Sequence, residues 1–410
     1  MLIFVVNMSR FLICLCVLLS GILSVPPSAS GVLQTMESVR KVDGNPYLYT
    51  MDYHVPYDLD DMVSKDVDEY VELLNYAVAR ILNVDHVNIA VPELGEAKGV
   101  QDVFNCTSFQ VLNENGCGYR FGRNYDYYKN PTLVTRTFPQ KGYASIAVCD
   151  MSFIGYSLDH VPKTIIQRLN CLVAVYAPLD GMNEKGFCGS ILALPSRFSS
   201  QQDTPNHDIG TSAVLRLMLD RCATVEEAIA LLESLDVRQD PMVKSGFHYM
   251  IADAGGNCAV IEFDPEDKWK TLIVRKPADR SYMQVTNHML APKYYSPEPD
   301  KEFGNTGSQS WTRYDRVGNY IEERGGTLSQ EEAFECLAQV RWVDLKVNDG
   351  LAAGTQYQIK FRGMKAVVEK LPERGAEDTQ YSCVYDQQNL VLSLRNWNDY
   401  DTTHTFSLLY

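Results

Sequence analysis

The 410-residue chain lacks an excess of positive charge. Its 37 lysines and arginines are outnumbered by 52 aspartates and glutamates, which gives a formal net charge of -15 at pH 7. Proteins that bind nucleic acid neutralise phosphates with basic side chains, whereas an acidic surface repels the phosphate backbone. We therefore expect no nucleic-acid partner.

Metal-binding patterns are also missing. The seven histidines include no pair with HxxxH spacing, and no two cysteines after residue 30 have CxxC spacing. Helical zinc hydrolases and zinc ribbons depend on such spacings. We expect neither a metal nor another cofactor, and a metallohydrolase has little support.

Long apolar runs are absent beyond residue 30. Near the N-terminus, Arg10 precedes an apolar run over residues 11–19, and small residues and prolines follow through Ser30. This run is short for a membrane-spanning helix, and the pattern is typical of a secretory signal peptide. We predict cleavage around residues 29–31, a secreted or extracytoplasmic protein, and no membrane span after signal removal. The alternative is a membrane anchor that stays in place.

Eleven cysteines occur, two of them inside the predicted signal peptide. The remaining nine are an odd number, which indicates at least one free thiol in an exported chain. Several lie in apolar runs, as Cys171 does, where a cysteine is typically a small buried hydrophobe. The sequence assigns no disulfide pairing. The nine are Cys106, Cys117, Cys149, Cys171, Cys188, Cys222, Cys258, Cys336 and Cys383.

The pattern of polar and apolar residues changes at Cys106. Residues before it are acidic and contain one amphipathic helical pattern over 67–82, with Ser64 and Asp66 as expected caps. After it, short β-like runs alternate with turns, helical patterns follow, and strands return, which fits a layered α+β domain. Helices are expected over 208–235, with a second capped start at Thr224, and over 328–340. Strands are expected over 106–112, 119–121, 143–148, 172–176, 248–253, 258–263, 382–385 and 390–394.

Cys106 begins the first of these strands. A turn at residues 113–116 returns the chain, so Arg123 and Asp126 come level with Cys106 across a hairpin. A thiol with a pKa of about 8.5 is mostly protonated at neutral pH. A nearby guanidinium favours the thiolate, and a carboxylate can orient the base that takes the proton. The alternative is a buried cysteine beside a surface Arg–Asp pair, which is favoured on spacing alone.

Several further segments occur in an order that resembles one family. Residues 106–108 (Cys-Thr-Ser) and 122–126 (Gly-Arg-Asn-Tyr-Asp) resemble the start of the choloylglycine hydrolase superfamily. That superfamily includes bile salt hydrolases, penicillin V acylases, N-acylethanolamine acid amidase and acid ceramidase. The later matches are 180–187 (Asp-Gly-Met-Asn-Glu-Lys-Gly-Phe), 249–262, 285–288 (Val-Thr-Asn-His), 310–316 (Ser-Trp-Thr-Arg-Tyr-Asp-Arg) and 381–386.

The resemblance implies an N-terminal nucleophile fold, which is an αββα four-layer sandwich. It also implies that Cys106 is both nucleophile and N-terminal residue of the mature enzyme. Carried over by position, Arg123 and Asp126 support the nucleophile, Asn287 contributes to the oxyanion hole and Arg313 belongs to the catalytic constellation. The implied reaction is hydrolysis of linear non-peptide C–N amide bonds.

The implied mechanism is chemically coherent. A free α-amine has a pKa of about 7.7–8.0, so it can act as general base beside the thiol of the same residue. Because Cys106 lies inside the chain, this mechanism requires cleavage between Asn105 and Cys106. Acid ceramidase and N-acylethanolamine acid amidase resemble this layout, with self-cleavage before the cysteine. We therefore divide the chain into a signal peptide (1–30), a propeptide or small N-terminal subunit (31–105) and a hydrolase domain (106–410).

One position departs from the family pattern. Bile salt hydrolases have a second substrate-contacting asparagine after the Asn-Glu-Lys-Gly segment, and Ala193 occupies that position here. This puts bile salt specificity and the second oxyanion contact in doubt, although a backbone donor can substitute. His288, next to Asn287, could serve a papain-like Cys–His scheme, but a packed or hydrogen-bonded histidine is the favoured interpretation.

Three functions remain open. The first is a hydrolase of small-molecule N-acyl amides, such as conjugated bile salts, penicillin V-type amides or fatty acyl amides. The second is an acyltransferase of the same fold, and the third is a non-catalytic binding protein that retains the fold. The acyl and amine groups and the oligomeric state are left undetermined.

Overall fold

In the computed structural model, the described residues are 27–87, 105–127, 129–240, 245–295, 305–341, 357–362, 365–370, 378–397 and 399–409. Most of the predicted signal peptide lies outside this set. The predicted cleavage region, residues 29–31, falls within helix α2 (Pro27–Ser38). Among the described residues, no helix is long and apolar enough to cross a membrane.

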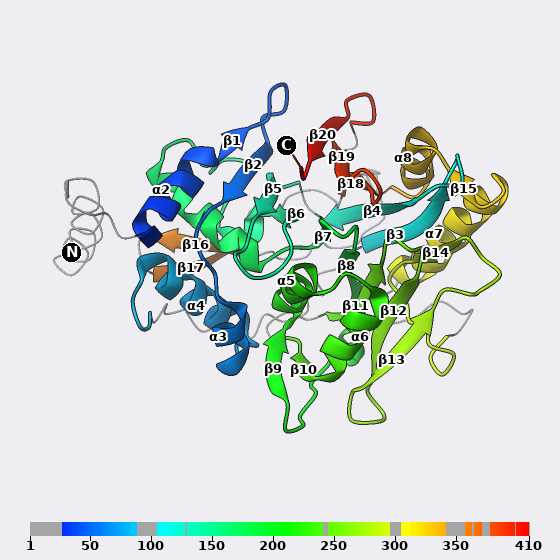
Figure 1. The fold of residues 1–410 in the computed structure, drawn as a ribbon, viewed down its shortest axis with the longest axis horizontal. Helices are drawn as coiled ribbons and strands as arrows, with labels where there is room; N and C mark the ends of the chain where they lie inside the picture. The colour runs from blue at the N-terminus through cyan, green and yellow to red at the C-terminus, as the bar shows by residue number, and fades with distance from the viewer. Residues whose placement is uncertain are drawn as a thin grey trace.

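Two large sheets form the centre of the described structure (Figure 1). Their strands are mostly antiparallel, with parallel pairs between β2 and β5 and between β15 and β3. In spatial order, the larger sheet has nine described strands, β1 (Arg40–Lys41), β2 (Leu48–Tyr53), β5 (Thr132–Thr137), β6 (Ser145–Asp150), β7 (Asp180–Asn183), β8 (Cys188–Leu194), β11 (Gly246–Ala252), β12 (Cys258–Asp264) and β13 (Lys270–Arg275). The other has seven, β14 (Tyr282–Val285), β3 (Asn105–Asn113), β4 (Tyr119–Tyr127), β18 (Asp378–Asp386), β19 (Val391–Asn396) and β20 (His404–Ser407), with β15 (Thr327–Leu328) beside β3.

Helices and two small sheets surround these strands. The α-helices and the three 3-10 helices (η) are α3 (Leu59–Ser64), α4 (Tyr70–Leu82), η1 (Met151–Ile154), η2 (Ile166–Tyr176), η3 (Ser196–Phe198), α5 (Thr211–Arg221), α6 (Val225–Glu233), α7 (Asn305–Glu322) and α8 (Gln330–Gln339). The small sheets are β9 (His207–Gly210) with β10 (Leu235–Arg238), and β16 (Tyr357–Arg362) with β17 (Lys365–Lys370).

Three buried clusters show how these elements are layered. Strand residues alternate between clusters, because successive side chains of a strand point to opposite faces. Ile191 of β8 packs with α5 and α6 on the outer face of the nine-stranded sheet, whereas Leu192 packs between the two sheets. On the far side, Phe109 of β3 packs against α7 and α8. The layers are therefore helix, sheet, sheet and helix, which confirms the predicted combination of helices and stacked sheets.

The N-terminal segment is built into the larger sheet. Strand β2 pairs in parallel with β5 over six residues, and β1 pairs with β2 at the edge. Arg136 of β5 holds Asp52 of β2 through two hydrogen bonds of 2.6 and 2.9 Å. Met62 of α3 and Leu74 of α4 belong to the same buried cluster as Leu215 of α5. Residues 27–87 thus form part of the larger sheet and of its buried cluster and are not a separate unit.

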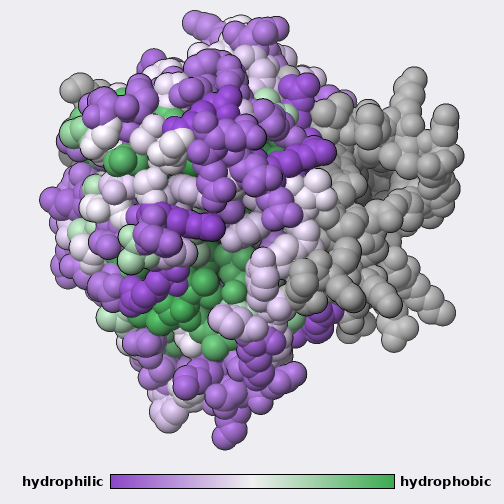
Figure 2. Space-filling model, turned by 90° about the vertical axis from the view of Figure 1, so that its right-hand side faces the viewer, coloured by the Kyte–Doolittle hydropathy of each residue, from purple (hydrophilic) through white to green (hydrophobic). Residues whose placement is uncertain are grey.

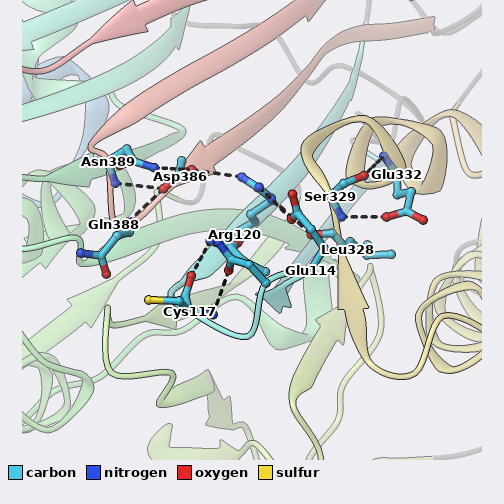
Figure 3. A network of polar contacts seen from close by, with 11 residues as sticks. Glu114, Cys117, Arg120, Leu328, Ser329, Glu332, Asp386, Gln388 and Asn389 are labelled. Atoms are coloured by element: carbon cyan, nitrogen blue, oxygen red, sulfur yellow. Dashed lines mark hydrogen bonds and ion pairs between the residues drawn. The ribbon is translucent and has the colours of Figure 1, made fainter.

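The hairpin that begins at Cys106 is closed at its far end by a buried arginine (Figure 3). Arg120 donates to Glu114 in the turn, to Asp386 at the end of β18 and to the carbonyl of Leu328 in β15. One side chain therefore joins three segments that are distant in sequence. This fixes the end of β3 and β4 that lies opposite Cys106.

Several sequence-based boundaries are wrong. Residues 172–176, expected as a strand, belong to the 3-10 helix η2. The helix expected over 208–235 is two helices flanked by β9 and β10, although the predicted capped start at Thr224 is confirmed by a capping box with Glu227. Helix α4 begins after Glu69, so Ser64 and Asp66 are not its caps: Ser64 ends α3, and Asp66 has a positive φ of 52°.

Candidate active site

Cys106 is the second residue of β3, and only 2% of its surface is exposed. Its side chain belongs to the cluster between the two sheets. The next side chain on that face, Ser108, lies 2.9 Å from Ser190 of β8 in the opposite sheet. The alternation of the strand therefore directs the Cys106 thiol toward the larger sheet.

The predicted hairpin brings Arg123 to this thiol. Cys106 pairs with Tyr125, and Ser108 pairs with Arg123, across β3 and β4. Arg123 is fully buried, and its Nη2 donates to Cys106 Sγ at 3.4 Å. Its Nη1 is buried with no hydrogen-bond partner among the described residues. A cationic donor therefore faces the sulfur, and another N–H lies close by.

Asp126 occupies the register position opposite Asn105. It is fully buried, and Thr379 of β18 donates to its Oδ1 at 2.6 Å. Its negative charge acts on the thiol from the same strand as Arg123. The Arg–Asp pair predicted from the spacing thus lies in the interior, and the alternative of a surface pair is wrong.

The pKa of the Cys106 thiol is raised above its ordinary value, chiefly by burial. The charge of Arg123 and its hydrogen bond lower this pKa, whereas the charge of Asp126 raises it. A backbone hydrogen bond from Ala193 also lowers it. In the uncleaved chain the desolvation of the thiolate outweighs these favourable contacts, so the thiol is held protonated at neutral pH.

Asn287 binds the backbone on the other side of Cys106. Its Oδ1 accepts the N–H of Cys106 at 2.7 Å, and its Nδ2 donates to the carbonyl of Ala193 at 2.8 Å. Its own N–H donates to Ser310 Oγ at 2.8 Å. The Asn287 side chain therefore bridges β3 of the seven-stranded sheet and β8 of the nine-stranded sheet.

Arg313 of α7 completes the arrangement. It donates through Nη2 to Asn287 Oδ1 at 2.8 Å and through Nη1 to the carbonyl of Cys106. It also donates to Thr107 Oγ1 at 3.0 Å and to Asn105 Oδ1 at 3.3 Å. One guanidinium thus holds the three residues that surround the Asn105–Cys106 bond. All five residues predicted from the sequence meet at the start of β3.

The backbone of Ala193 faces this group because β8 is longer than its neighbour β7. The two strands pair only as far as Asp180 and Ser190, and the N–H of Ile191 then donates to Leu179. Backbone N–H groups two residues apart in a strand point in the same direction, so the N–H of Ala193 points to the same side of β8 as that of Ile191. At Ala193, however, β7 has already ended and does not occupy that side. The N–H and carbonyl of Ala193 therefore point toward Cys106 and Asn287.

A buried network, not found from the sequence, supports the Asn287 segment. His248 lies 2.9 Å from the carbonyl of Thr286 through Nε2 and 3.2 Å from Glu262 through Nδ1. Glu262 also accepts the N–H groups of Leu290 and Ala291. This network fixes the backbone on both sides of Asn287. The signal lay in β12, where Glu262 interrupts an apolar run that extends from Cys258 to Phe263.

His288 packs away from the sulfur in a set of aromatic rings. Its ring stacks on Trp311 with 3.6 Å between centroids, and its Nδ1 lies 2.8 Å from Ser310 Oγ. Burial lowers the pKa of His288 to about 3, and the charges of His248 and Arg313 act in the same direction. These contacts give His288 a packing role and favour Arg123 as the side chain that acts on the thiol.

The described residues contain neither a disulfide nor a candidate metal site. The nine cysteines after the N-terminal segment are unpaired within the described structure, and all except Cys117 are buried. The described residues contain no group of three or more His, Cys, Asp or Glu side chains placed to hold a metal ion.

The face of the molecule that Figure 2 shows is mostly hydrophilic, with a recessed apolar area in its lower half. Recessed apolar surface is a property of sites that bind apolar ligands.

A family-model match supports the resemblance found in the sequence. Residues 173–346 match the family model of acyl-coenzyme A:6-aminopenicillanic acid acyl-transferase. Similar solved structures include a variant of conjugated bile acid hydrolase from Clostridium perfringens, with 17% identity over 74% of this chain and 92% of that chain and a TM-score of 0.49. Penicillin V acylase from Agrobacterium tumefaciens has 18% identity over 73% of this chain and 85% of that chain, with a TM-score of 0.43. No curated protein sequence matches the chain.

Proposed function

We propose that this protein is an N-terminal nucleophile hydrolase of linear, non-peptide C–N amide bonds, with Cys106 as its nucleophile. The observation that carries this proposal is the contact of Arg123 with the Cys106 sulfur, while Asn287 and Arg313 bind the backbone of the same residue. A merely structural cysteine does not require two buried guanidinium groups. The family match to an acyl-transferring enzyme supports the same class of chemistry.

Maturation begins at the Asn105–Cys106 bond. The Cys106 thiol attacks the carbonyl carbon of Asn105, the C–N bond breaks, and the Cys106 nitrogen takes up the proton that the sulfur releases. Water then hydrolyses the thioester, which leaves a carboxylate on Asn105 and a free amine and thiol on Cys106. Arg313 and Asn287 already hold both sides of this bond in the uncleaved chain.

The released α-amine supplies the general base. Its pKa of about 7.7–8.0 suits proton transfer near neutral pH. Asn287 Oδ1 accepts from the Cys106 nitrogen before cleavage, and the carboxylate of Asp126 lies on the adjacent strand. Both groups can orient the amine beside the thiol, and Asp126 stabilises its protonated form.

The proposed oxyanion hole consists of two N–H groups. The backbone N–H of Ala193 reaches the Cys106 sulfur. The amide nitrogen of Asn287 carries two hydrogens, of which one is used by the Ala193 carbonyl. Donors placed where negative charge develops stabilise the tetrahedral intermediate strongly. The backbone at position 193 thus replaces the missing second asparagine.

The N-terminal segment acts as a small subunit rather than a released propeptide. Its strand β2 and helices α3 and α4 form part of the sheet and the main buried cluster. Removing it would expose the apolar face that it covers, at a cost of about 25 cal/mol for each Å². We therefore propose that residues 31–105 stay bound to residues 106–410 after the chain is cut, so that the mature protein is a secreted heterodimer.

The substrates are small-molecule N-acyl amides with an apolar acyl group, and the recessed apolar area on the face shown in Figure 2 supports this choice. Ala193 argues against assuming conjugated bile salts. A penicillin V-type amide and a fatty acyl amide are the two further classes to test.

Acyl transfer is the second candidate function. The match of residues 173–346 to an acyl-transferase family model favours it, since the thioester intermediate can pass its acyl group to an amine instead of water. Product analysis with and without an added amine distinguishes the two reactions.

Intact-mass measurement with N-terminal sequencing tests the main proposal. The expected result is a fragment that begins Cys-Thr-Ser-Phe, together with amide hydrolysis that Cys106→Ala abolishes. A Cys106→Ala chain that is still cut at this bond and still active would refute the proposal.

A further inference from the structure

A carboxylate on the opposite sheet holds the arginine that faces Cys106. Asp180 is the first residue of β7 and is fully buried. Its Oδ2 accepts from Arg123 Nε at 3.1 Å, and both side chains are completely inaccessible to solvent. The pair therefore joins β7 of the nine-stranded sheet to β4 of the seven-stranded sheet.

Three further donors surround the same carboxylate, all from β18. Tyr381 donates to Oδ2, Tyr385 donates to Oδ1 at 2.5 Å, and Cys383 donates to Oδ1 at 3.5 Å. These residues alternate along the strand, so all three side chains point toward the larger sheet. With Arg123, the carboxylate accepts four hydrogen bonds, which fix its position and leave it little freedom to move.

We propose that Asp180 is the positioning residue of the active site, which fixes Arg123 so that its Nη2 meets the Cys106 thiolate. An isolated guanidinium in this interior would be strongly unfavourable, and it would turn toward whatever partner or water it could reach. The Nε bond to Asp180 fixes the plane of the guanidinium and leaves Nη2 on the sulfur. Asp180 acts through Arg123 and does not contact the sulfur in this arrangement. The inference rests on the proposed function only in taking Cys106 as the reactive thiol.

The two effects of Asp180 on the thiol have opposite signs. As a negative charge, Asp180 disfavours the thiolate. As the anchor of Arg123, it favours the thiolate by holding a cation 3.4 Å from the sulfur. The other charged groups that face Cys106 are Asp126 on β4 and Arg313 on α7. Because both remain in an Asp180 variant, the sign of the change shows which effect of Asp180 dominates.

The test is the pH dependence of alkylation of Cys106 by iodoacetamide. The full chain is used in a Cys117→Ser background, because Cys117 is the exposed cysteine among the nine. Mass spectrometry follows the Cys106 peptide, and samples are compared only in the same cleavage state. Asp180→Asn should move the midpoint of alkylation upward by about one pH unit and slow it about tenfold at neutral pH.

A milder variant covers the case in which Asp180→Asn does not fold. Tyr385→Phe removes one hydrogen bond to the carboxylate and keeps its charge, so the midpoint should rise by a smaller amount. Tyr249→Phe is the matched control, since it removes a buried hydroxyl that donates to Thr211 on the opposite side of the larger sheet. Its midpoint should equal that of the parent chain.

A midpoint that falls in Asp180→Asn would overturn the proposal, because the carboxylate would then act only as a negative charge. Unchanged midpoints in both variants, with native melting curves, would also overturn it. These outcomes are separate from failure of the proposed function. A shifted midpoint in a protein that cleaves no amide supports the positioning role and contradicts the hydrolase.

Discussion

The side chain of Asn287 accepts the backbone N–H of Cys106 at 2.7 Å, although 181 residues separate them in the chain. The same side chain donates to Ala193, so three segments meet around one amide group. In the proposed mechanism this group binds the Cys106 nitrogen both before cleavage, when it is an amide, and after cleavage, when it is an amine. The proposal thus gives Asn287 a role in maturation and in turnover, and the oxygen and nitrogen of its side chain can be tested separately.

Replacing Asn287 by Asp should separate these roles. The variant keeps an oxygen that accepts from the Cys106 nitrogen, but it loses the N–H donors proposed for the oxyanion. We expect cleavage to proceed, more slowly, while kcat for amide hydrolysis falls about 10²–10³-fold. Gel analysis of cleavage and steady-state kinetics measure the two effects. Equal activity in the variant would exclude Asn287 from the oxyanion hole.

Replacing Cys106 itself should abolish both processes. Cys106→Ala is expected to remain a single uncleaved chain with no amide hydrolysis, because both reactions need the sulfur. Cys117→Ser is the matched control, since Cys117 is an exposed thiol in the hairpin turn, and it should be cleaved and active. Intact mass and product release provide the measurements.

The stability of the protein should decrease in acid partly through His288. Burial lowers the pKa of this histidine to about 3, so between about pH 6.5 and 3 the unfolded chain binds a proton that the folded chain does not. The free energy of unfolding therefore falls with decreasing pH by up to about 1.4 kcal/mol per unit in this range.

His288→Asn removes the titrating ring and can keep a hydrogen bond to Ser310. Its stability should be lower than that of the parent at pH 7 but should decline less between pH 6 and 4. Urea unfolding across this pH range measures the difference. Parallel curves for parent and variant would show that folding does not lower the pKa of His288.

The two products of cleavage should remain together. After cutting, the N-terminal fragment is expected to co-elute with the larger fragment in size-exclusion chromatography and to separate only in denaturant. Asp52→Asn weakens the two hydrogen bonds to Arg136 in the β2–β5 pair. It should lower the denaturant midpoint for separation by an amount equivalent to about 1–2 kcal/mol. Separation of the native fragments by simple dilution would contradict the subunit assignment.

Helix caps and hairpin contacts could be predicted from the sequence where they depend on residues that are close together in the chain. The capped start at Thr224 follows from a threonine three residues before Glu227, and the structure has that capping box. The hairpin from Cys106 follows from a turn between two β-like runs, and its register brings Arg123 to the sulfur. In both cases the information lies within about twenty residues.

Features that depend on distant partners could not be predicted. Residues 172–176 are apolar enough for a strand, but they form a 3-10 helix packed under the N-terminal helices. Asp180 stood in a recognised motif, yet its partners come from β4 and β18, which are distant in sequence. No local pattern shows which buried cation a buried carboxylate will meet. For the same reason, the acidic N-terminal zone gave no sign that β2 pairs in parallel with β5.

The greater length of β8 relative to β7 has a consequence for how the proposed site can evolve. In the proposed mechanism the donor at position 193 belongs to the main chain, so every amino acid except proline can supply it. Ala193 is buried, so a substitution there changes the local packing but leaves the proposed donor in place. The proposed reaction therefore does not depend on the chemistry of this side chain.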